Sequence, residues 1–428
     1  MKNALYHYIS ISKKYRTLSV SFFVMWVILQ NVSFAVNFDE LSPKPLWENL
    51  QIRLRQSHLN RPSLYALLTQ EKNASQDALD STSIWLAATG DLMFHSPQVN
   101  AAYQAATGTY DFKETFQSVK PYLSAADFAL GNFETTTAGS ERGYSGYPAF
   151  NAPDATLDAL KWAGYDFLST ANNHCLDRGI SGLERTISQM RDRGILQSGT
   201  FMQGEKEVPR YTRLSINGID LAVISLTYGC NGIENSLSLE TRHQAVNLID
   251  ESWLQDTLTA IENTDVDQTI VFIHWGNEYQ RDPSLYQRTL ADKMFLWGAD
   301  IILGSHPHVI QPSEIVEIDG DSKYIIYSMG NFVSNQSRHT LSSSNKVYTE
   351  NGVIPFIQLT KSQDNTSITA VNHIPTWVYK YKDTSGTHYE ILPLESRNAY
   401  SDVENIHLLT QGSYDATMSM MENYKKTE

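Results

Sequence analysis

Residues 298–308 read GADIILGSHPH, and this stretch shows the pattern from which the fold is predicted. A short apolar run lies between two glycines and is followed by two histidines that flank a proline. Apolar runs of four to eight residues bounded by turn residues are typical of buried strands. We therefore predict a buried strand here, with His306 and His308 just after its carboxyl end.

The same pattern recurs on both sides of this stretch. Six further apolar runs end in polar, often glycine-bearing turns: IWLAA (84–88), FAL (128–130), YDFLST (165–170), LAVISL (221–226), TIVFIHW (269–275) and YIIYSM (324–329). Helical patterns lie between several of them, at 154–164, 182–194 and 284–300; the last places Leu285, Thr289, Met294 and Leu296 near one side. Strands that alternate with helices indicate an α/β domain. After residue 350 the runs 353–360 and 367–380 follow without a helix, which predicts closing antiparallel strands.

Composition excludes several classes of protein. The chain has 428 residues, of which 41% are hydrophobic and 11% aromatic, enough for a sizeable core. The net charge is −14 with no long single-sign run, which excludes nucleic-acid binding through a basic face. Two cysteines exclude a disulfide-dense scaffold and a multi-cysteine metal site. Cys175 and Cys230 could pair in an oxidising compartment, although we expect them to be unpaired.

The first 35 residues have the features of an export signal. They contain four basic and no acidic residues, the apolar run LSVSFFVMWVIL (18–29), and small residues before Ala35. This order is typical of a secretory signal peptide, cleaved near Ala35, and predicts an exported protein of the periplasm, cell envelope or extracellular space. An uncleaved membrane anchor is the alternative. Beyond it we expect a helical extension (36–82), the main domain (83–395) and a C-terminal weak helix and tail (396–428).

Polar side chains gather where the predicted strands end. In open α/β sheets, ligands bind outside the carboxyl ends of the strands. The residues at these positions are Asp91, Glu134, Asn173, His174, His274, His306, His308 and Asn331. Each turn alone is weak evidence, but imidazole, carboxylate and amide groups together suit a divalent transition metal such as Zn, Mn or Fe. The sequence therefore predicts a site for one or two such ions.

At this point the set of motifs is recognisable. ATGDLMFH, LGNFETTTAG, STANNHCLDRGISGL, VFIHWGNEY, GADIILGSHPHVIQPSE and YSMGNFVSNQ resemble, in order, the motifs of the CapA family of bacterial poly-γ-glutamate capsule synthesis proteins. That family looks like a branch of the calcineurin-like metallophosphatases. The resemblance covers about residues 84–334 and implies a four-layer α/β/β/α sandwich.

The resemblance also implies roles for single residues. Asp91 is similar to the first-motif metal ligand, Glu134 stands where metallophosphatases place a bridging aspartate, and Asn173 resembles the amide ligand. His174 resembles the general acid that protonates the leaving group. His274 and His306 resemble ligands of one metal, and His308 a ligand of the other.

The chain departs from the metallophosphatase pattern in the first motif. Asp91 is followed by Leu92 and Met93, so the histidine of the usual Asp-x-His is missing and one metal position is weakened. His95 stands where the family often has arginine and is open to anion binding, metal contact or packing. Three more residues fit the motifs without assigned chemistry: Glu278, Glu314 and Asn331.

Three functions remain open on the sequence. The first is a metal-dependent hydrolase acting on γ-glutamyl amide bonds of poly-γ-glutamate or a related capsule polymer. The second is a non-catalytic, metal-containing module that binds, exports or anchors such a polymer beside membrane-bound capsule synthesis proteins. The third is a secreted metallophosphoesterase. An anionic polymer is the expected partner in the first two, with four arginines in motif loops as candidates for a local positive pocket: Arg142, Arg178, Arg281 and Arg338.

Overall fold

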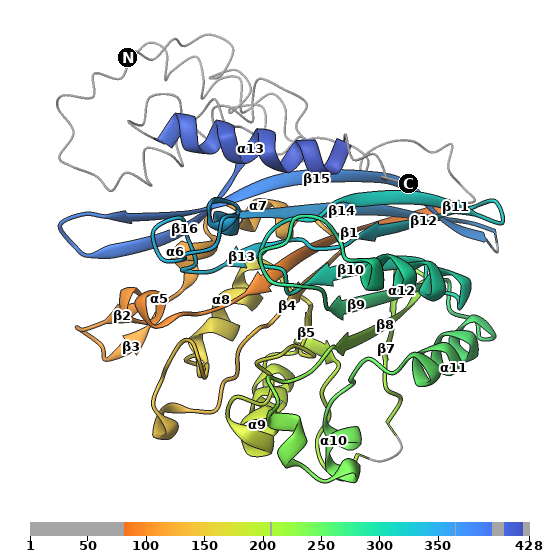
Figure 1. Ribbon diagram of the computed structural model, residues 1–428, viewed down its shortest axis with the longest axis horizontal. Coiled ribbons are helices and arrows are strands. Elements are labelled where there is room, and N and C mark those ends of the chain that lie inside the picture. Colours follow the sequence, from red (N-terminus) through yellow and green to blue (C-terminus); the bar gives the residue numbers. More distant parts are fainter. Residues whose placement is uncertain (1–80, 206–207, 364, 396–405, 423–428) are drawn as a thin grey trace, which may run out of the picture. The chain divides into compact units, whose positions relative to one another are not determined.

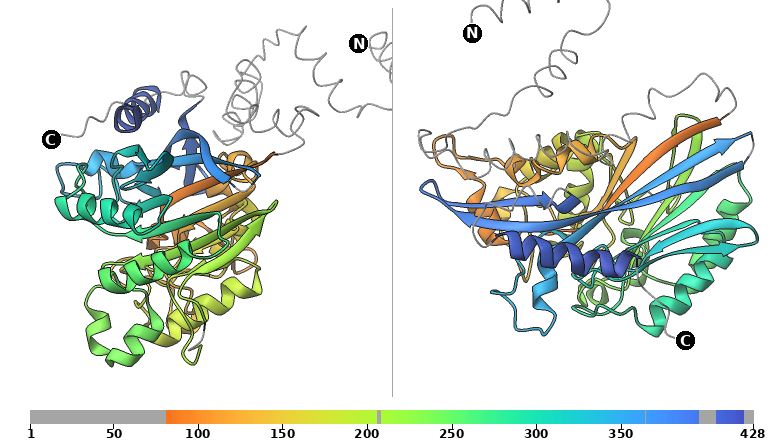
Figure 2. Two further views of the ribbon diagram at one scale, coloured as in Figure 1. Left: turned by 90° about the vertical axis from the view of Figure 1, so that its right-hand side faces the viewer. Right: turned by 90° about the horizontal axis from the view of Figure 1, so that it is seen from above.

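The computed structural model describes residues 81–205, 208–363, 365–395 and 406–422. The predicted signal peptide and nearly all of the helical extension lie outside these residues. Ser81 and Thr82, placed at the end of that extension, already belong to the first strand. Within the described part, two main β-sheets pack face to face and helices cover their outer faces (Figures 1 and 2). The predicted α/β/β/α layering is confirmed.

The first sheet is mixed. Its order is β16-β15-β14-β1-β4-β5-β6, and β13 also pairs with β1. The strands β1, β4, β5 and β6 run parallel, whereas β14, β15 and β16 are antiparallel, as expected after residue 350. The bounds are β1 Ser81–Leu92, β4 Phe128–Asn132, β5 Phe167–Ser169, β6 Leu196–Ser198, β13 Asn331–Val333, β14 Asn351–Ser362, β15 Asn365–Lys382 and β16 Thr387–Pro393.

The second sheet has a parallel centre and antiparallel edges. Its order is β11-β12-β10-β9-β8-β7, with the two edge strands antiparallel to their neighbours. The bounds are β7 Thr212–Ile216, β8 Ile219–Thr227, β9 Gln268–His274, β10 Ile301–Ser305, β11 Ser313–Ile318 and β12 Asp321–Ile326. A small hairpin, β2 Tyr103–Gln104 and β3 Thr109–Tyr110, stands apart from both sheets.

Side chains of β1 pack alternately into two different cores. Ile84, Leu86 and Ala88 pack into the core between the two sheets, whereas Trp85 and Ala87 pack into the core beneath the helices. Side chains of a strand point alternately to opposite faces, so both faces of β1 are buried and the strand reads as a continuous apolar run.

The helices close the outer faces. The core of the first sheet includes residues of α5 to α8, and that of the second sheet includes residues of α11 and α12. The bounds are α5 Ser96–Ala101, α6 Lys113–Phe116, α7 Lys120–Leu123, α8 Ala155–Ala163, α9 Gly179–Asp192, α10 Leu239–Ala245, α11 Glu251–Glu262, α12 Leu285–Leu296 and α13 Ile406–Glu422, with single 3₁₀ turns at Ser140–Arg142, Ile233–Ser236 and Lys346–Glu350.

The buried face of α12 differs from the one that we expected. Leu285 and Leu296 are 79% and 73% exposed, and Gln287 is fully buried instead. Gln287 completes a capping box with Ser284 and donates from Nε2 to Gln311 at 2.8 Å. Because the Gln287 amide is hydrogen-bonded, it can be buried, and α12 therefore turns a different face to the core from the one that contains Leu285 and Leu296.

The C-terminal segment contributes to the core. Within the expected tail, α13 places Ile406 beside Trp377 and Leu392, and Met421 in the core between the sheets. Among the described residues, no helix is long and apolar enough to cross a membrane.

Candidate metal centre

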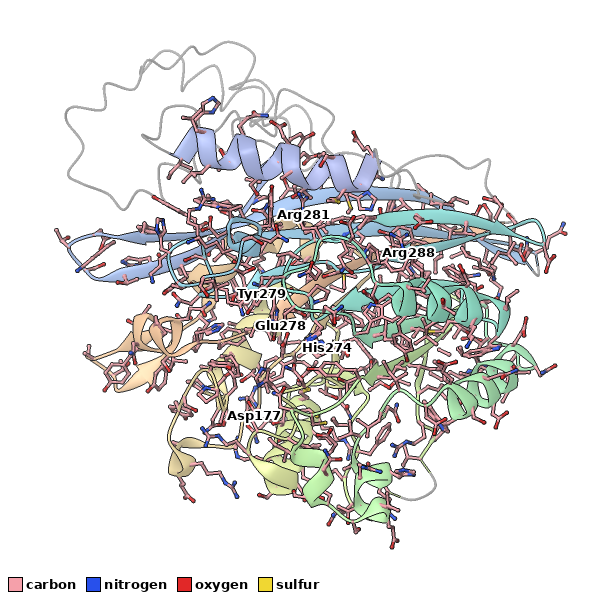
Figure 3. The ribbon with its side chains drawn as sticks, in the orientation of Figure 1. Asp177, His274, Glu278, Tyr279, Arg281 and Arg288 are labelled. Carbon is pink, nitrogen blue, oxygen red and sulfur yellow. The ribbon has the colours of Figure 1, made fainter. Side chains whose placement is uncertain are left out.

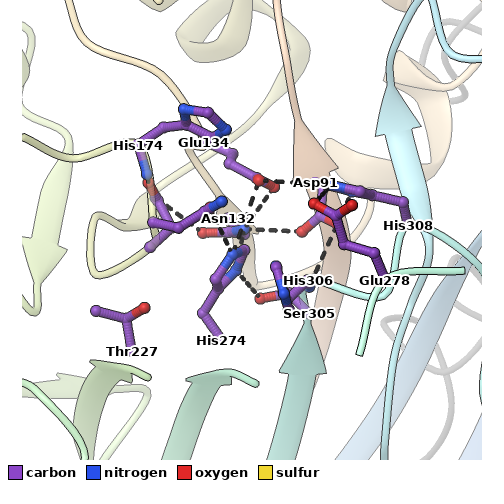
Figure 4. A network of polar contacts seen from close by, with 12 residues as sticks. Asp91, Asn132, Glu134, His174, Thr227, His274, Glu278, Ser305, His306 and His308 are labelled. Atoms are coloured by element: carbon purple, nitrogen blue, oxygen red, sulfur yellow. Dashed lines mark hydrogen bonds and ion pairs between the residues drawn. The ribbon is translucent and has the colours of Figure 1, made fainter. Parts of the chain in front are cut away.

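Loops from both sheets meet at one place. The carboxyl ends of β1, β4 and β5 come from the first sheet, and those of β9 and β10 from the second (Figure 4). All seven residues proposed from the sequence as ligands or acid lie here and are buried: Asp91, Glu134, Asn173, His174, His274, His306 and His308. The structure brings these side chains together, and their individual roles stay predictions.

Asp91 forms the centre of a polar network. It is fully buried, and its Oδ2 atom lies 3.0 Å from Nδ1 of His308. Its Oδ1 atom accepts a hydrogen bond of 2.8 Å from Nδ2 of Asn132. Asn132 also lies 3.2 Å from Nδ1 of His274, so this amide joins a ligand candidate of each sheet.

Glu134 presents an oxygen without a hydrogen-bond partner. Its Oε1 atom is buried and lies 3.7 Å from Nε2 of His274 and 3.8 Å from Nε2 of His308. These separations are too long for hydrogen bonds. Two ligands of one ion, each at about 2.0–2.2 Å, lie roughly 3–4 Å from each other. Burial, and then the charge of Asp91, raises the pKa of Glu134 well above its usual value, and a cation beside the carboxylate would favour its ionised form.

The histidines are held in the form that binds metals. Burial lowers the pKa of His274 well below its ordinary value, and burial together with His308 lowers the pKa of His306 to about 3. Neutral imidazole is the ligand form of histidine. His274 is oriented by Ser305, 3.0 Å from Nδ1, and its Nε2 lies 2.9 Å from Oδ1 of Asn173.

The HPH loop holds an unusual backbone. His306 and His308 have φ angles of 99° and 58°, a region that residues other than glycine seldom adopt. Nδ1 of His306 is buried without a hydrogen-bond partner. A Cβ at Gly304 would lie 2.0 Å from the carbonyl oxygen of Tyr327, so only glycine fits before the loop. Strained backbone of this kind clusters at functional sites.

Three groups of side chains have ligand atoms within 4.8 Å of one another. Two are wholly buried: Glu134 with His274 and His306, and Asp91 with Glu134 and His308. Glu134 belongs to both, as a bridging carboxylate does. The third group joins Glu278 to His306 and His308. Buried carboxylates, neutral imidazoles and two unpartnered ligand atoms fit a divalent cation.

His174 is oriented by a neighbour in its own loop. Its Nδ1 atom lies 2.8 Å from Oδ2 of Asp177, and both side chains are buried. The same carboxylate oxygen accepts a 2.6 Å hydrogen bond from the backbone N–H of Phe150. The ring of Phe150 packs edge-on against His174, at 4.7 Å between centroids. This pairing fixes the ring and leaves Nε2 for proton transfer.

Other motif residues serve the scaffold. Nδ1 of His95 accepts a bond from the N–H of Asn335, and His95 is outside the three ligand groups of the described residues. Asn331 donates to Gln336 and to the carbonyl of Thr349. Glu314 lines a separate cavity of about 520 Å³ beside α13.

The four motif-loop arginines are engaged within the chain. Arg142 donates to Ser181 and to the carbonyl of Arg178, and Arg178 donates to Ser145 and Ala149. Arg281 donates to the carbonyl of Ala416, and Arg338 forms a two-pronged pair with Glu350. Within the described part of the chain, only Arg338 of the four is paired with a carboxylate; Arg142, Arg178 and Arg281 bond to neutral groups and keep their charge, so the positive pocket stays a prediction.

Sequence reasoning assigned no chemistry to four residues of the centre: Asn132, Asp177, Tyr228 and Glu278. The signal for Asp177 was its place three residues after His174, and that for Glu278 was its motif, VFIHWGNEY. Tyr228 is half-exposed and packs on His306 at 4.6 Å between ring centroids. Figure 3 labels Asp177, Glu278 and His274 in the context of the sheets.

The two cysteines belong to one small apolar cluster, and Cys175 directly follows His174 in the chain. Cys175 and Cys230 are free, buried thiols with their Sγ atoms 3.5 Å apart. The structure thus shows two free thiols whose sulfur atoms are neighbours, and whether they pair stays open.

Comparison with known proteins adds three findings. Residues 85–336 match the family model described as bacterial capsule synthesis protein PGA_cap. The chain is 30% identical to the capsule biosynthesis protein CapA of Bacillus anthracis and to the PGA biosynthesis protein CapA of Bacillus subtilis, over 53% and 52% of this chain and 55% and 57% of those proteins. It thus spans little more than half the length of these relatives. A calcineurin-like phosphoesterase of Bacillus subtilis aligns with a TM-score of 0.43 and 13% identity, covering 79% of this chain and 99% of that one.

Proposed function

Because the chain belongs to the family of bacterial capsule synthesis proteins, we propose that it is an exported, metal-dependent hydrolase of γ-glutamyl amide bonds in poly-γ-glutamate or a related envelope polymer. The observation that supports this most directly is the pairing of the two buried ligand groups, which share Glu134, with an oriented His174–Asp177 pair. Export through a signal peptide cleaved near Ala35 is part of the proposal; N-terminal sequencing of the mature protein tests it against retention of the segment as an anchor.

The residues that would hold the ions are those of the two buried groups, with Asn173 beside His274. A divalent cation bound there supplies a Lewis acid that polarises a carbonyl and lowers the pKa of water towards about 7. Zn, Mn and Fe are the candidates, in one or two copies, because the donor set mixes nitrogen and oxygen.

The chain's own residues complete the reaction. Water adds its oxygen to the amide carbonyl carbon, and the C–N bond then breaks. His174 gives a proton from Nε2 to the departing nitrogen, and the proton released by the water restores the imidazole. Asp177 holds the ring through Nδ1 and so orients Nε2 for the transfer. Positioned proton transfer of this kind contributes about 10²–10⁴-fold in rate.

The decisive experiment measures metal and turnover together. The full chain, purified without chelator, is analysed for bound metals beside His306→Ala and the exposed-residue control His243→Ala. We expect one or two transition-metal ions per chain, lost only in His306→Ala, and release of free amine from poly-γ-glutamate. Metal with chelator-sensitive polymer binding but no turnover would favour the non-catalytic module instead. Steady phosphate release from simple esters would favour the phosphoesterase.

A further inference from the structure

The first motif leaves one side of the centre short of a ligand. Met93 occupies the second position after Asp91 and is buried, and its N–H bonds to the carbonyl of Val333. The group formed by Asp91, Glu134 and His308 therefore has two oxygens and one nitrogen. A catalytic metal site usually has three protein ligands and one open position, so this side has room for one further donor.

Glu278 approaches the centre from its solvent side. Its Oε1 atom lies 4.0 Å from Nε2 of His308, and its side chain is 46% exposed while that of His308 is 2% exposed. With His306 and His308 it forms the third group whose ligand atoms lie within 4.8 Å of one another. Figure 4 shows its carboxylate directed toward His308 and Asp91.

The backbone around Glu278 is fixed to the HPH loop. The N–H of the next residue, Tyr279, donates to the carbonyl of Pro307 at 2.8 Å. The carbonyl of Tyr279 accepts from Nδ2 of Asn345 at 2.7 Å, and Tyr279 itself has a positive φ of 62°. The loop of Glu278 is thus anchored to Pro307, which lies between the two candidate ligands His306 and His308. Because these hydrogen bonds already fix its backbone, the half-exposed carboxylate is positioned to bind a cation.

We propose that Glu278 is a metal ligand that binds a second cation together with His308, its neighbour in the third group, and supplies a donor in place of the histidine missing from the first motif. The inference rests on the proposed function for the existence of the metal centre. The carboxylates of Asp91 and Glu134 also lie beside His308, so this side of the centre is richer in oxygen than the Glu134–His274–His306 position and suits a hard ion such as Mn²⁺. Because the Glu278 side chain is 46% exposed, we expect an ion at this position to exchange with solvent more readily than one at the buried position.

The test counts Mn²⁺ ions, independently of any activity. The full chain is freed of metal with a chelator and titrated with Mn²⁺, and free Mn²⁺ is followed by electron paramagnetic resonance. We expect the wild type to bind two ions. In Glu278→Gln the second ion should bind at least about tenfold more weakly, so that one ion is bound at concentrations that fill both wild-type sites. Even indirect contacts to a metal are worth about 10–100-fold in affinity. Glu278→Asp, which keeps the charge, should hold two ions at intermediate affinity.

The control is Asp282→Asn, which removes an exposed carboxylate from the same loop and should retain two ions. Two ions at unchanged affinity in Glu278→Gln would overturn the proposal, and so would a single ion in the wild type. If Glu278 governs the second ion but no polymer is cleaved, the ligand proposal stands and the hydrolase proposal fails. Retained far-ultraviolet circular dichroism in Glu278→Gln excludes unfolding as the cause of ion loss.

Discussion

The Nδ1 atom of His308 lies 3.0 Å from Oδ2 of Asp91, although the two residues are 217 positions apart in the chain. Asp91 extends β1 in the first sheet, and His308 follows β10 in the second. Their contact, fully buried on both sides, closes the candidate centre across the junction of the two sheets. A cation beside this pair of candidate ligands would stabilise it, whereas without a cation Asp91 lies near a second buried carboxylate, Glu134, whose pKa it raises.

Asp91→Asn should separate these two effects. Without metal, the variant is expected to be at least as stable as the wild type, because Asp91 raises the pKa of the neighbouring Glu134 after burial itself. With Mn²⁺ at 100 times its dissociation constant, the wild type should gain about 2.7 kcal/mol and the variant clearly less. Thermal unfolding with Mn²⁺ and with chelator measures both. Equal metal-induced shifts in Asp91→Asn and the exposed control Asp256→Asn would contradict the assignment of Asp91 as a ligand.

His174→Ala and Asp177→Asn should affect turnover but not metal content. Loss of the proton donor is expected to lower kcat on a γ-glutamyl substrate by about 10²–10⁴-fold, and loss of its orienting carboxylate should have an effect in the same direction. Steady-state kinetics beside elemental analysis measures the two readouts. Full activity of His174→Ala would remove it as the acid, and loss of metal in either variant would assign the pair to the ligand shell.

His373 should make the chain sensitive to acid. It lies on β15 of the first sheet, and its Nε2 is 2.9 Å from the hydroxyl of Tyr324 on β12 of the second. Burial lowers the pKa of His373 from 6.5 to about 4, so the folded chain binds this proton less readily than the unfolded chain. The free energy of unfolding is therefore not lowered by His373 above about pH 6.5. It falls as the pH drops towards 4, by up to about 1.4 kcal/mol per pH unit, because the unfolded chain takes up this proton more readily. Urea unfolding across this range should show a shallower acid limb for His373→Gln, with His243→Gln unchanged; parallel limbs for all three would refute the assignment.

Replacement by alanine should lower the free energy of unfolding at Gly90 and raise it at Gly412. A Cβ on Gly90 would lie 1.9 Å from the carbonyl oxygen of Gly330, where Asp91 N–H bonds to the same oxygen at 3.0 Å. Overpacking of this kind costs about 1–3 kcal/mol or more. Gly412 lies within α13 with no atom within 4 Å of the added Cβ, so Gly412→Ala should gain about 0.5–1 kcal/mol. Chemical denaturation gives both values, and a neutral Gly90→Ala would show that β1 tolerates a side chain at this approach.

Cys175 and Cys230 should close a disulfide when a disulfide oxidant such as oxidised glutathione is supplied. Their Sγ atoms are 3.5 Å apart, and a bond needs about 2.05 Å, a small local movement. Two thiols are oxidised as one glutathione disulfide is reduced to two thiols. The crosslink should stabilise the chain by about 2–4 kcal/mol. Thiol titration before and after unfolding counts the free groups; two titratable thiols after prolonged oxidation would contradict the prediction, and Cys230→Ser serves as the uncrosslinked reference.

The apolar runs of the sequence located seven strands because those strands are buried on both faces. The edge strands β7 and β11 were not predicted, because partly buried and exposed residues alternate along them and they contain no continuous apolar run. The strand-end rule likewise gathered the histidines and carboxylates at one edge of the fold. It could not assign Asn132 or Glu278, because their roles depend on distances to His274 and His308 that lie on the other sheet or loop.

The division of the ligands between the sheets also sets the order in which the molecule is completed. Asp91, Glu134 and Asn173 come before residue 180, and the three candidate histidine ligands His274, His306 and His308 come after residue 270, so neither half of the chain holds the full donor set. A cation that needs the full donor set would therefore bind only when both sheets are in place, and its binding would be coupled to folding. If the chain is exported as proposed, such an ion would come from the compartment in which folding ends rather than from the one in which the chain is synthesised.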